Sequence, residues 1–116
     1  MHLERKQAMN LTTISTVELK EKLQNNDPLR LIDVREPYEY RICHLPDAVR
    51  IPLQRIPDQA PALDRYLPTV VYCHHGVRSQ LVVKYLVKNC GFRNVVSLSG
   101  GIHAWATEVD DKMQQY

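Results

Sequence analysis

The chain has 116 residues, a length that suits one domain rather than two. Its 15 Lys and Arg residues and 13 Asp and Glu residues give a net charge of +2. That excess is too small to indicate nucleic acid or a membrane surface as a partner. Three scattered cysteines, Cys43, Cys73 and Cys90, lack the paired spacing of a disulfide framework and suit a reducing compartment.

No apolar run approaches the roughly 20 residues of a membrane helix. Residues 1–10 also lack the apolar core of a signal peptide. We therefore expect a cytoplasmic protein with a flexible N-terminus over residues 1–10 and a single domain over residues 11–116.

The first half of the chain alternates between strand and helix patterns. Residues 10–14 predict a short strand, and Ser15 with Glu18 fits a capping box that begins a helix ending near residue 25. Residues 29–34 predict a second strand, after which Pro37 suits the first position of another helix. That helix is expected to end at about residue 42. A loop over residues 43–48, a strand over 49–53 and short helical turns between 54 and 67 should follow.

The second half centres on residues 73–79, which read Cys-His-His-Gly-Val-Arg-Ser. The preceding residues 69–72 are β-branched and aromatic, which predicts a strand that ends at Cys73. From Gln80 onward, apolar residues recur at intervals of three and four, which predicts a helix that ends near Gly91. The last predicted elements are a strand over residues 94–98 and a helix from residue 102 to about residue 112.

This alternation predicts an α/β fold, a parallel five-stranded sheet with helices on both faces. Ligands of such sheets bind outside the carboxyl ends of the strands. Two loops rich in functional residue types, residues 33–36 and 73–79, follow predicted strands. We expect both loops to open onto the same face of the molecule.

The position of Cys73 predicts a nucleophile. It lies where a strand ends and a helix begins, and the first N–H groups of a helix lack partners at the positive end of the helix dipole. These groups favour the thiolate, which is the reactive form of cysteine. They can also hold an anion beside the sulfur. The sequence therefore predicts cysteine chemistry on an anionic substrate.

Four segments of the chain resemble the rhodanese family of sulfurtransferases. They follow the family order and spacing, which makes the match more specific than any single motif. The segments are Asp33-Val34-Arg35, residues 43–52, the Cys-x-x-Gly-x-Arg-Ser loop at residues 73–79, and residues 98–105 with their Gly-Gly pair and Trp105. Two usual glycines of the family are replaced, by Cys43 and Asp47. Asp tolerates a positive φ better than Cys, so we expect the loop to differ near Cys43.

The resemblance implies a sulfurtransferase that works in two steps. The Cys73 thiolate takes the outer sulfur of thiosulfate or of a protein persulfide and becomes a persulfide itself. A thiophilic acceptor, cyanide in an assay or a thiol in the cell, then removes that sulfur. No cofactor and no metal ion is expected, and the oligomeric state stays open.

The resemblance also implies which residues form the site. We expect the loop N–H groups from His74 to Ser79 to surround the transferred sulfur. The expected substrate-binding residues are His74, His75, Gly76, Val77, Arg78, Ser79 and Arg35. Both arginines have an alternative structural role, which for Arg78 is an ion pair with Asp33 or Glu39. Asp33 and Glu39 are expected to support the site, since a bare carboxylate such as Asp33 beside a thiolate would oppose its ionisation.

Two other functions remain open. One is a non-catalytic rhodanese-like docking module, against which the presence of Cys73 argues. The other is a cysteine phosphatase or arsenate reductase, whose loop needs one residue more than the four that separate Cys73 from Arg78. The shorter loop fits a single sulfur atom better than a phosphate. A zinc site built from Cys43-His44 and residues 73–75 is disfavoured, because adjacent residues rarely converge on one tetrahedral ion.

Overall fold

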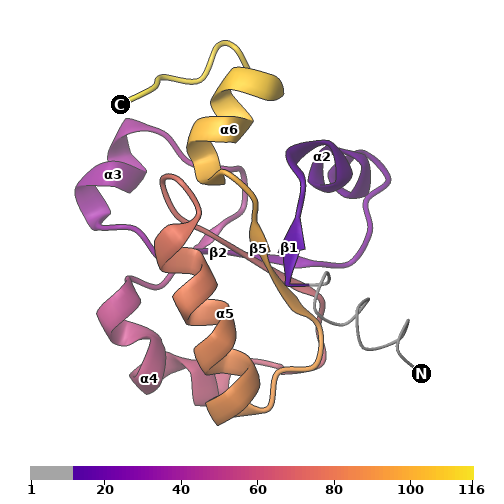
Figure 1. Cartoon of the computed structure of the whole chain (residues 1–116), viewed down its shortest axis with the longest axis vertical. Coiled ribbons are helices and arrows are strands. Elements are labelled where there is room, and N and C mark those ends of the chain that lie inside the picture. Colours follow the sequence, from indigo (N-terminus) through magenta and orange to yellow (C-terminus); the bar gives the residue numbers. More distant parts are fainter. Residues whose placement is uncertain (1–11) are drawn as a thin grey trace.

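A computed structural model describes residues 12–116 of the chain (Figure 1). The flexible N-terminus predicted over residues 1–10 lies outside the described residues, as do the first two residues of the predicted first strand. Within residues 12–116, no helix combines the length and the apolar character that crossing a membrane requires.

Five parallel strands form one sheet in the spatial order β1-β5-β4-β2-β3. They are β1 (Thr13–Ile14), β2 (Arg30–Asp33), β3 (Val49–Arg50), β4 (Thr69–Tyr72) and β5 (Val95–Leu98). The central strand β4 pairs with β2 on one side and β5 on the other, and all of its residues are buried. A run of β-branched and aromatic residues suits a strand that is covered on both faces. The predicted α/β fold is confirmed.

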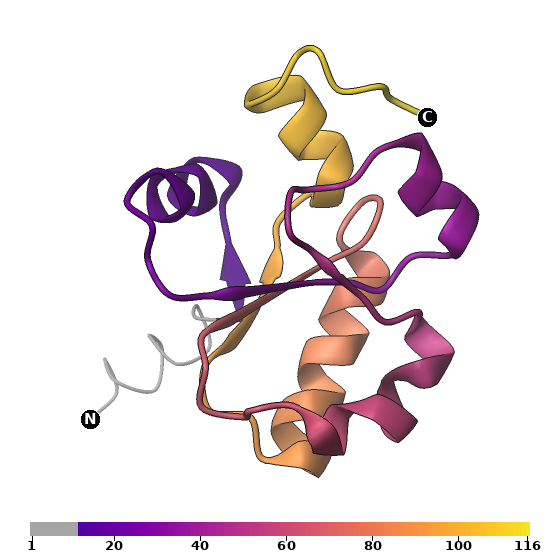
Figure 2. The ribbon, with the colours of Figure 1, turned by 180° about the vertical axis from the view of Figure 1, so that it is seen from behind.

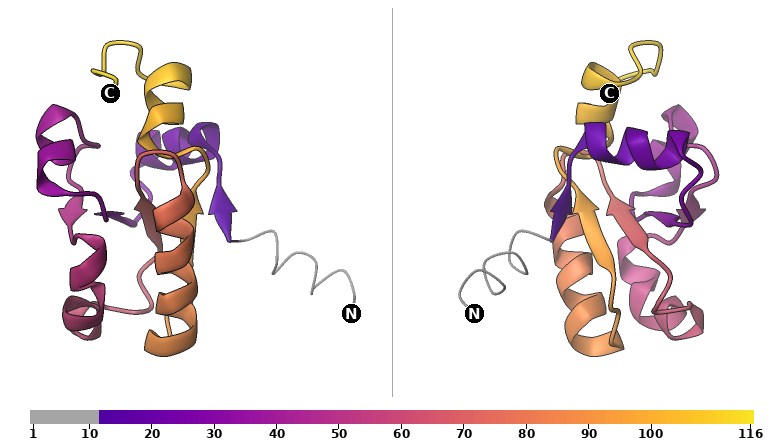
Figure 3. Two further views of the ribbon diagram at one scale, coloured as in Figure 1. Left: turned by 60° about the vertical axis from the view of Figure 1, so that its left-hand side comes forward. Right: turned by 90° about the vertical axis from the view of Figure 1, so that its right-hand side faces the viewer.

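Helices cover both faces of the sheet, as predicted. They are α2 (Thr16–Gln24), α3 (Pro37–Ile42), α4 (Ile56–Gln59), α5 (Val77–Cys90) and α6 (Gly101–Glu108), with 3-10 turns η1 (Leu53–Arg55) and η2 (Ala60–Ala62) flanking α4. The two views of Figure 3 show α2 and α5 on opposite sides of the sheet. The predicted capping box is present: Ser15 Oγ accepts the Glu18 N–H at 3.1 Å, and the Glu18 carboxylate accepts the Ser15 N–H at 3.0 Å.

Three predicted boundaries are wrong. The strand over residues 49–53 stops at Arg50, because Pro52, with a φ of −53°, directly precedes a helical turn over residues 53–55. The helix predicted from Gln80 begins at residue 77, since Gly76 adopts φ +102° and turns the chain into the helix. The last helix ends at residue 108 instead of near Lys112. There the Asp110 carboxylate accepts the Lys112 N–H at 3.1 Å, a local bond that favours a turn over a helix.

The two faces of the sheet carry separate parts of the core, because side chains alternate along a strand. On one face, Val71 packs with Cys73 and with apolar residues of α4 and α5. On the other face, Tyr72 packs with Trp105 of α6 and with Leu19 of α2. The alternation at the end of β4 therefore points Cys73 toward the side that carries α5.

The carboxyl ends of three strands bring the predicted functional loops together. Asp33, the last residue of β2, pairs in register with Tyr72, the last residue of β4, and the next residue is Cys73. β5 ends nearby at Leu98, just before α6. Residues 109–116 then run from α6 toward α3 in both Figure 1 and Figure 2. Four distant parts of the chain thus meet at one edge of the sheet.

Candidate active site

The Cys73 sulfur lies inside a loop of inward-pointing donors. Cys73 is 1% exposed. Its Sγ accepts the N–H of Gly76 at 3.1 Å and the N–H of Ser79 at 3.3 Å, and it lies 3.4 Å from Ser79 Oγ. Ser79 Oγ is itself 2.7 Å from Ser97 Oγ of β5. Two backbone N–H groups thus converge on one sulfur atom, an arrangement suited to hold a negatively charged atom in the loop.

Two glycines allow the loop to curl against the start of α6. Gly76 has φ +102°, and a Cβ on it would lie 3.2 Å from the nitrogen of Gly100. Gly101 has φ +63°, and a Cβ on it would lie 2.6 Å from the carbonyl oxygen of Cys73. Side chains at these positions would push the two segments apart, which accounts for Gly76 and for the second glycine of the Gly-Gly pair.

Hydrogen bonds from α6 fix the same loop. The N–H of Ile102 donates to the Cys73 carbonyl at 2.9 Å, and the N–H of His103 donates to the His74 carbonyl at 3.0 Å. These donors belong to the first turn of α6 and have no partners within their own helix. The cysteine loop therefore caps one helix while it forms the beginning of another.

Arg35 is enclosed in a structural network. It is 2% exposed and forms a salt bridge of 2.7 Å with Asp33. Its five guanidinium N–H groups go to both Asp33 carboxylate oxygens, the carbonyls of Glu39 and Cys43, and the hydroxyl of Tyr116. The guanidinium has no donor left for a substrate, which is at odds with the prediction that Arg35 binds the sulfur donor. Asp33 pairs with Arg35 at the end of β2, a contact that agrees with the expected supporting role of Asp33.

Arg78 pairs with Glu39 through two parallel hydrogen bonds of 2.8 and 3.0 Å. Tyr116 also donates its hydroxyl to Glu39, at 2.7 Å. Burial by itself raises the pKa of Glu39, but the hydrogen bonds from Arg78 and Tyr116 bring it down to about 2. The bond to Glu39 in turn raises the pKa of Arg78. The structure thus contains the Arg78–Glu39 contact that the supporting role requires, and not a contact with Asp33.

The remaining loop residues lie at the surface. Val77, at the start of α5, is 71% exposed, and His75 is also exposed. His74 is half-buried under the ring of Tyr116, with the ring centroids 3.8 Å apart. Burial and the neighbouring His75 lower the pKa of His74, which disfavours its charged form.

Comparison with known proteins assigns the family. Residues 15–108 match the family described as the rhodanese-like domain. The chain belongs to this family. It is 40% identical over 104 residues to "Putative sulfurtransferase YtwF" of Bacillus subtilis, an alignment that covers 90% of this chain and 99% of that protein. The crystal structure of a rhodanese-like domain protein from Staphylococcus aureus matches with a TM-score of 0.76 and 33% identity, over 90% of this chain and 98% of the other.

Some relatives are much longer. "Adenylyltransferase and sulfurtransferase UBA4" of Debaryomyces hansenii is 38% identical over 94 residues, which make up 74% of this chain and 21% of that protein. This rhodanese-like domain therefore spans about a fifth of the length of such relatives. The short and the long relatives are both named as sulfurtransferases, the first of them as a putative one.

The two positions where this rhodanese-like domain lacks the usual glycine behave differently. Asp47 adopts φ +61°, a left-handed conformation that Asp tolerates. Cys43 is fully extended at φ −163°, so it needs no glycine, and its carbonyl accepts Arg35 Nη2 at 2.7 Å. Burial raises the pKa of the Cys43 thiol, which disfavours its thiolate.

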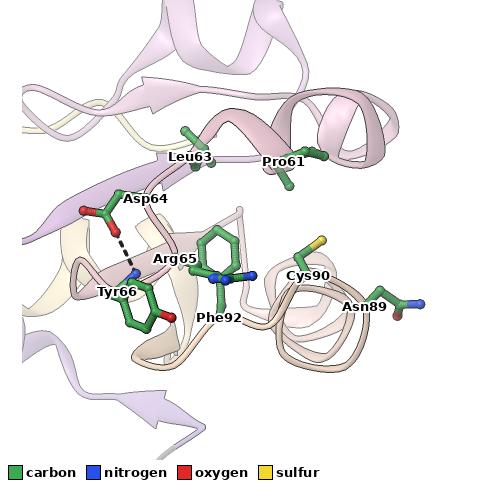
Figure 4. Close-up of a pocket in the computed structure, with 9 residues that line it drawn as sticks. Pro61, Leu63, Asp64, Arg65, Tyr66, Asn89, Cys90 and Phe92 are labelled. Atoms are coloured by element: carbon green, nitrogen blue, oxygen red, sulfur yellow. Dashed lines mark hydrogen bonds between the residues drawn. The ribbon is translucent and has the colours of Figure 1, made fainter.

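One cavity of the structure lies away from Cys73. It has a volume of about 490 Å³ and is lined by residues that include Arg65, Tyr66, Cys90 and Phe92 (Figure 4). Cys90 is the last residue of α5, whereas the Cys73 loop lies at its first residue, so a helix length of about 20 Å separates them. This cavity therefore does not coincide with the cysteine loop.

Sequence reasoning missed two residues near the site, His103 and Tyr116. His103 follows the recognisable Gly-Gly pair, and its place beside the cysteine loop depends on how α6 docks. Tyr116 follows a segment without periodicity or motif. Its contacts with Arg35, Glu39 and His74 span most of the chain, and nothing local in the sequence predicts them.

Proposed function

We propose that this domain transfers sulfane sulfur through a persulfide on Cys73. The observation that carries the proposal is the Cys73 sulfur itself, which accepts two backbone N–H groups at the N-terminus of α5. These donors are rigid parts of the backbone, so they stabilise charge on sulfur without reorganising during the reaction.

The first step forms a sulfur–sulfur bond. The Cys73 thiolate attacks the outer sulfur of thiosulfate, the bond between the two thiosulfate sulfurs breaks, and sulfite leaves with the electron pair. The product is a persulfide whose terminal sulfur carries the negative charge. In our proposal the N–H groups of the loop, from His74 to Ser79, hold that charge, and the donors at Gly76 and Ser79 support this role.

The second step returns the enzyme to its starting state. A thiophilic acceptor attacks the terminal sulfur, and the electron pair of the sulfur–sulfur bond returns to Cys73 as a thiolate. With cyanide as the acceptor the product is thiocyanate, and with a cellular thiol it is a new persulfide. The sequence of two half-reactions follows ping-pong logic.

The supporting residues hold this loop in shape. In our proposal Asp33 and Arg35 anchor the loop after β2, while Glu39 and Arg78 hold the start of α5 against α3. Arg35 is assigned to support rather than to donor binding, because its N–H groups are all engaged. His74 and His75 line the approach to the sulfur.

The donor is either thiosulfate or a protein persulfide. The long relatives named as adenylyltransferase and sulfurtransferase support a protein partner, because their rhodanese-like part belongs to a larger protein. The three free thiols of the described residues support a reducing compartment such as the cytoplasm.

A turnover assay tests the proposal. We expect the wild-type protein to form thiocyanate from thiosulfate and cyanide, and Cys73→Ser to lose all of this activity while keeping its circular dichroism spectrum. Cys90→Ser is the matched control, since Cys90 lies at the far end of α5, and it should retain wild-type activity. Equal activity in the Cys73→Ser variant would overturn the proposal.

Two further assays separate the alternatives. The same preparation should not hydrolyse p-nitrophenyl phosphate, and hydrolysis that depends on Cys73 would favour a phosphatase. Polysulfide replaces thiosulfate in a parallel assay, because it resembles a persulfide donor. Inactivity of the folded protein with both donors would favour a docking module.

A further inference from the structure

Three histidines gather at the mouth of the cysteine loop, outside the groups that hold the sulfur. His74 and His75 belong to the loop itself, and His103 lies on the first turn of α6. Each ring offers one nitrogen, and these three nitrogens all lie within 4.8 Å of one another. The centroid of the His75 ring lies 4.0 Å from that of His74 and 5.0 Å from that of His103.

The backbone and a ring contact hold these side chains near one another. The His103 N–H donates to the His74 carbonyl at 3.0 Å, which ties two of the three residues together directly. The ring of His74 stacks on Tyr116 with an interplanar angle of 7°, which limits its rotation. His75 is exposed and free to adjust.

One nitrogen of the cluster lacks a partner. Nδ1 of His103 is buried and accepts or donates no hydrogen bond to any described residue. Leaving a buried polar nitrogen unpaired costs free energy, so such an atom calls for a ligand, an ion or a water molecule. His103, which carries this unpaired atom, is also the residue that α6 brings to His74 and His75.

The spacing fits a transition-metal ion. Neighbouring nitrogen ligands of a tetrahedral zinc ion lie about 3.4 Å apart, given a Zn–N distance of about 2.0–2.1 Å. Small rotations of the side chains close the difference from the distances in the cluster. Imidazole is a preferred ligand of zinc, copper and nickel, and three histidines leave one coordination position open.

We propose that His74, His75 and His103 together bind one divalent transition-metal ion of the zinc type. The sequence-based expectation of no metal considered only adjacent cysteine and histidine pairs. His103 changes that expectation because it comes from a different element, α6, and lies beside the two histidines of the loop. The site is separate from the sulfur atom of Cys73, so metal binding is measured without any sulfur donor.

Equilibrium dialysis with Zn²⁺ tests the proposal. We expect one tightly bound ion per chain, and a loss of affinity of about tenfold or more in both His103→Gln and His75→Gln. His75 is exposed, so the second variant leaves the fold intact even if the first one weakens it. His44→Gln is the matched control, because His44 is an exposed histidine outside the cluster, and it should bind Zn²⁺ as the wild type does.

A Co²⁺ spectrum identifies the ligands. We expect visible bands of a site with nitrogen ligands, unchanged in Cys73→Ser and lost in His75→Gln. A charge-transfer band from thiolate to metal that disappears in Cys73→Ser would overturn the proposal, since the ion would then be held by the cysteine. Absence of saturable Zn²⁺ binding, or equal binding by the two histidine variants and the wild type, would also overturn it.

Discussion

Glu39 connects two distant parts of the chain to its own helix. Its carboxylate accepts both hydrogen bonds of Arg78, the hydroxyl of Tyr116 and the backbone N–H of Glu36. Only 3% of this residue is exposed, so these bonds replace the water that a carboxylate normally holds. The single residue thereby links α3, the start of α5 and the C-terminal segment.

Glu39→Gln should lower the free energy of unfolding by about 2 kcal/mol near neutral pH. The pKa of Glu39 is about 2 in the folded protein, below its ordinary value of 4.5. The ionised group therefore adds stability above about pH 4.5, and this stability is lost as the pH falls through about 2. Urea unfolding at several pH values should show the two proteins converging in acid. A difference that is independent of pH would contradict this assignment.

Arg78→Ala should affect the fold more than the chemistry. The change removes both hydrogen bonds from Arg78 to Glu39 and leaves the buried carboxylate without its positively charged partner. We expect the free energy of unfolding to fall by about 1–3 kcal/mol. We expect a lower melting temperature, and a rate of thiocyanate formation within about tenfold of the wild type, or 1.4 kcal/mol in activation free energy. A normal melting temperature with lost activity would instead assign Arg78 to the sulfur donor.

At the scale of secondary structure, the site depends on how α6 meets the cysteine loop. The first N–H groups of α6 bond to the carbonyls of Cys73 and His74, and Gly101 permits the close approach. The Gly-Gly pair is visible in the sequence as a break between a strand and a helix. The reason for its second glycine is tertiary, because the cysteine loop, which lies earlier in the chain, fills the space beside Gly101.

Gly101→Ala tests this contact. Its Cβ would meet the carbonyl oxygen of Cys73 at 2.6 Å on a backbone with φ +63°, so we expect a loss of stability of about 3 kcal/mol or more. Gly91→Ala is the matched control. Its φ is +70°, but the nearest atom, in the side chain of Arg65, is 3.6 Å away, so the cost should be about 1 kcal/mol. Thermal unfolding of both variants measures the difference, and equal losses would contradict a contact at Gly101.

At the scale of the whole molecule, the sheet and most helices could be predicted from local patterns. The strand that ends at Cys73, the capping box at Ser15 and the helix at Pro37 each depend on neighbours in the sequence. The three boundaries that failed depend on local backbone geometry: the turn that follows Pro52, the left-handed conformation of Gly76 and the Asp110 bond after residue 108.

The cysteine loop of the candidate site was predictable, because Cys73 and the amides that donate to it lie within one short segment. The surroundings of the loop were not predictable. Tyr116 and His103 reach the loop from the C-terminal part of the chain, and Arg35 meets Glu39, Cys43 and Tyr116 only when α3 and the C-terminal segment pack around it. Such contacts form only when the whole fold is assembled.

The C-terminal segment should therefore stabilise the molecule as a whole. Tyr116→Phe removes one hydrogen bond each from Arg35 and Glu39, and we expect a loss of about 1–2 kcal/mol in the free energy of unfolding. Tyr38→Phe is the control, because Tyr38 is 58% exposed, and it should leave stability unchanged. Equal unfolding curves for the wild type and Tyr116→Phe would show that this contact does not form in solution.

The most direct test of the account is the mass of the intact protein after incubation with thiosulfate, or with polysulfide in parallel, followed by cyanide. We predict a gain of one sulfur atom that maps to the peptide of Cys73, disappears with cyanide and is absent from Cys73→Ser. A folded protein that gains no sulfur from either donor, or gains it on Cys43 or Cys90, would contradict sulfur transfer through Cys73.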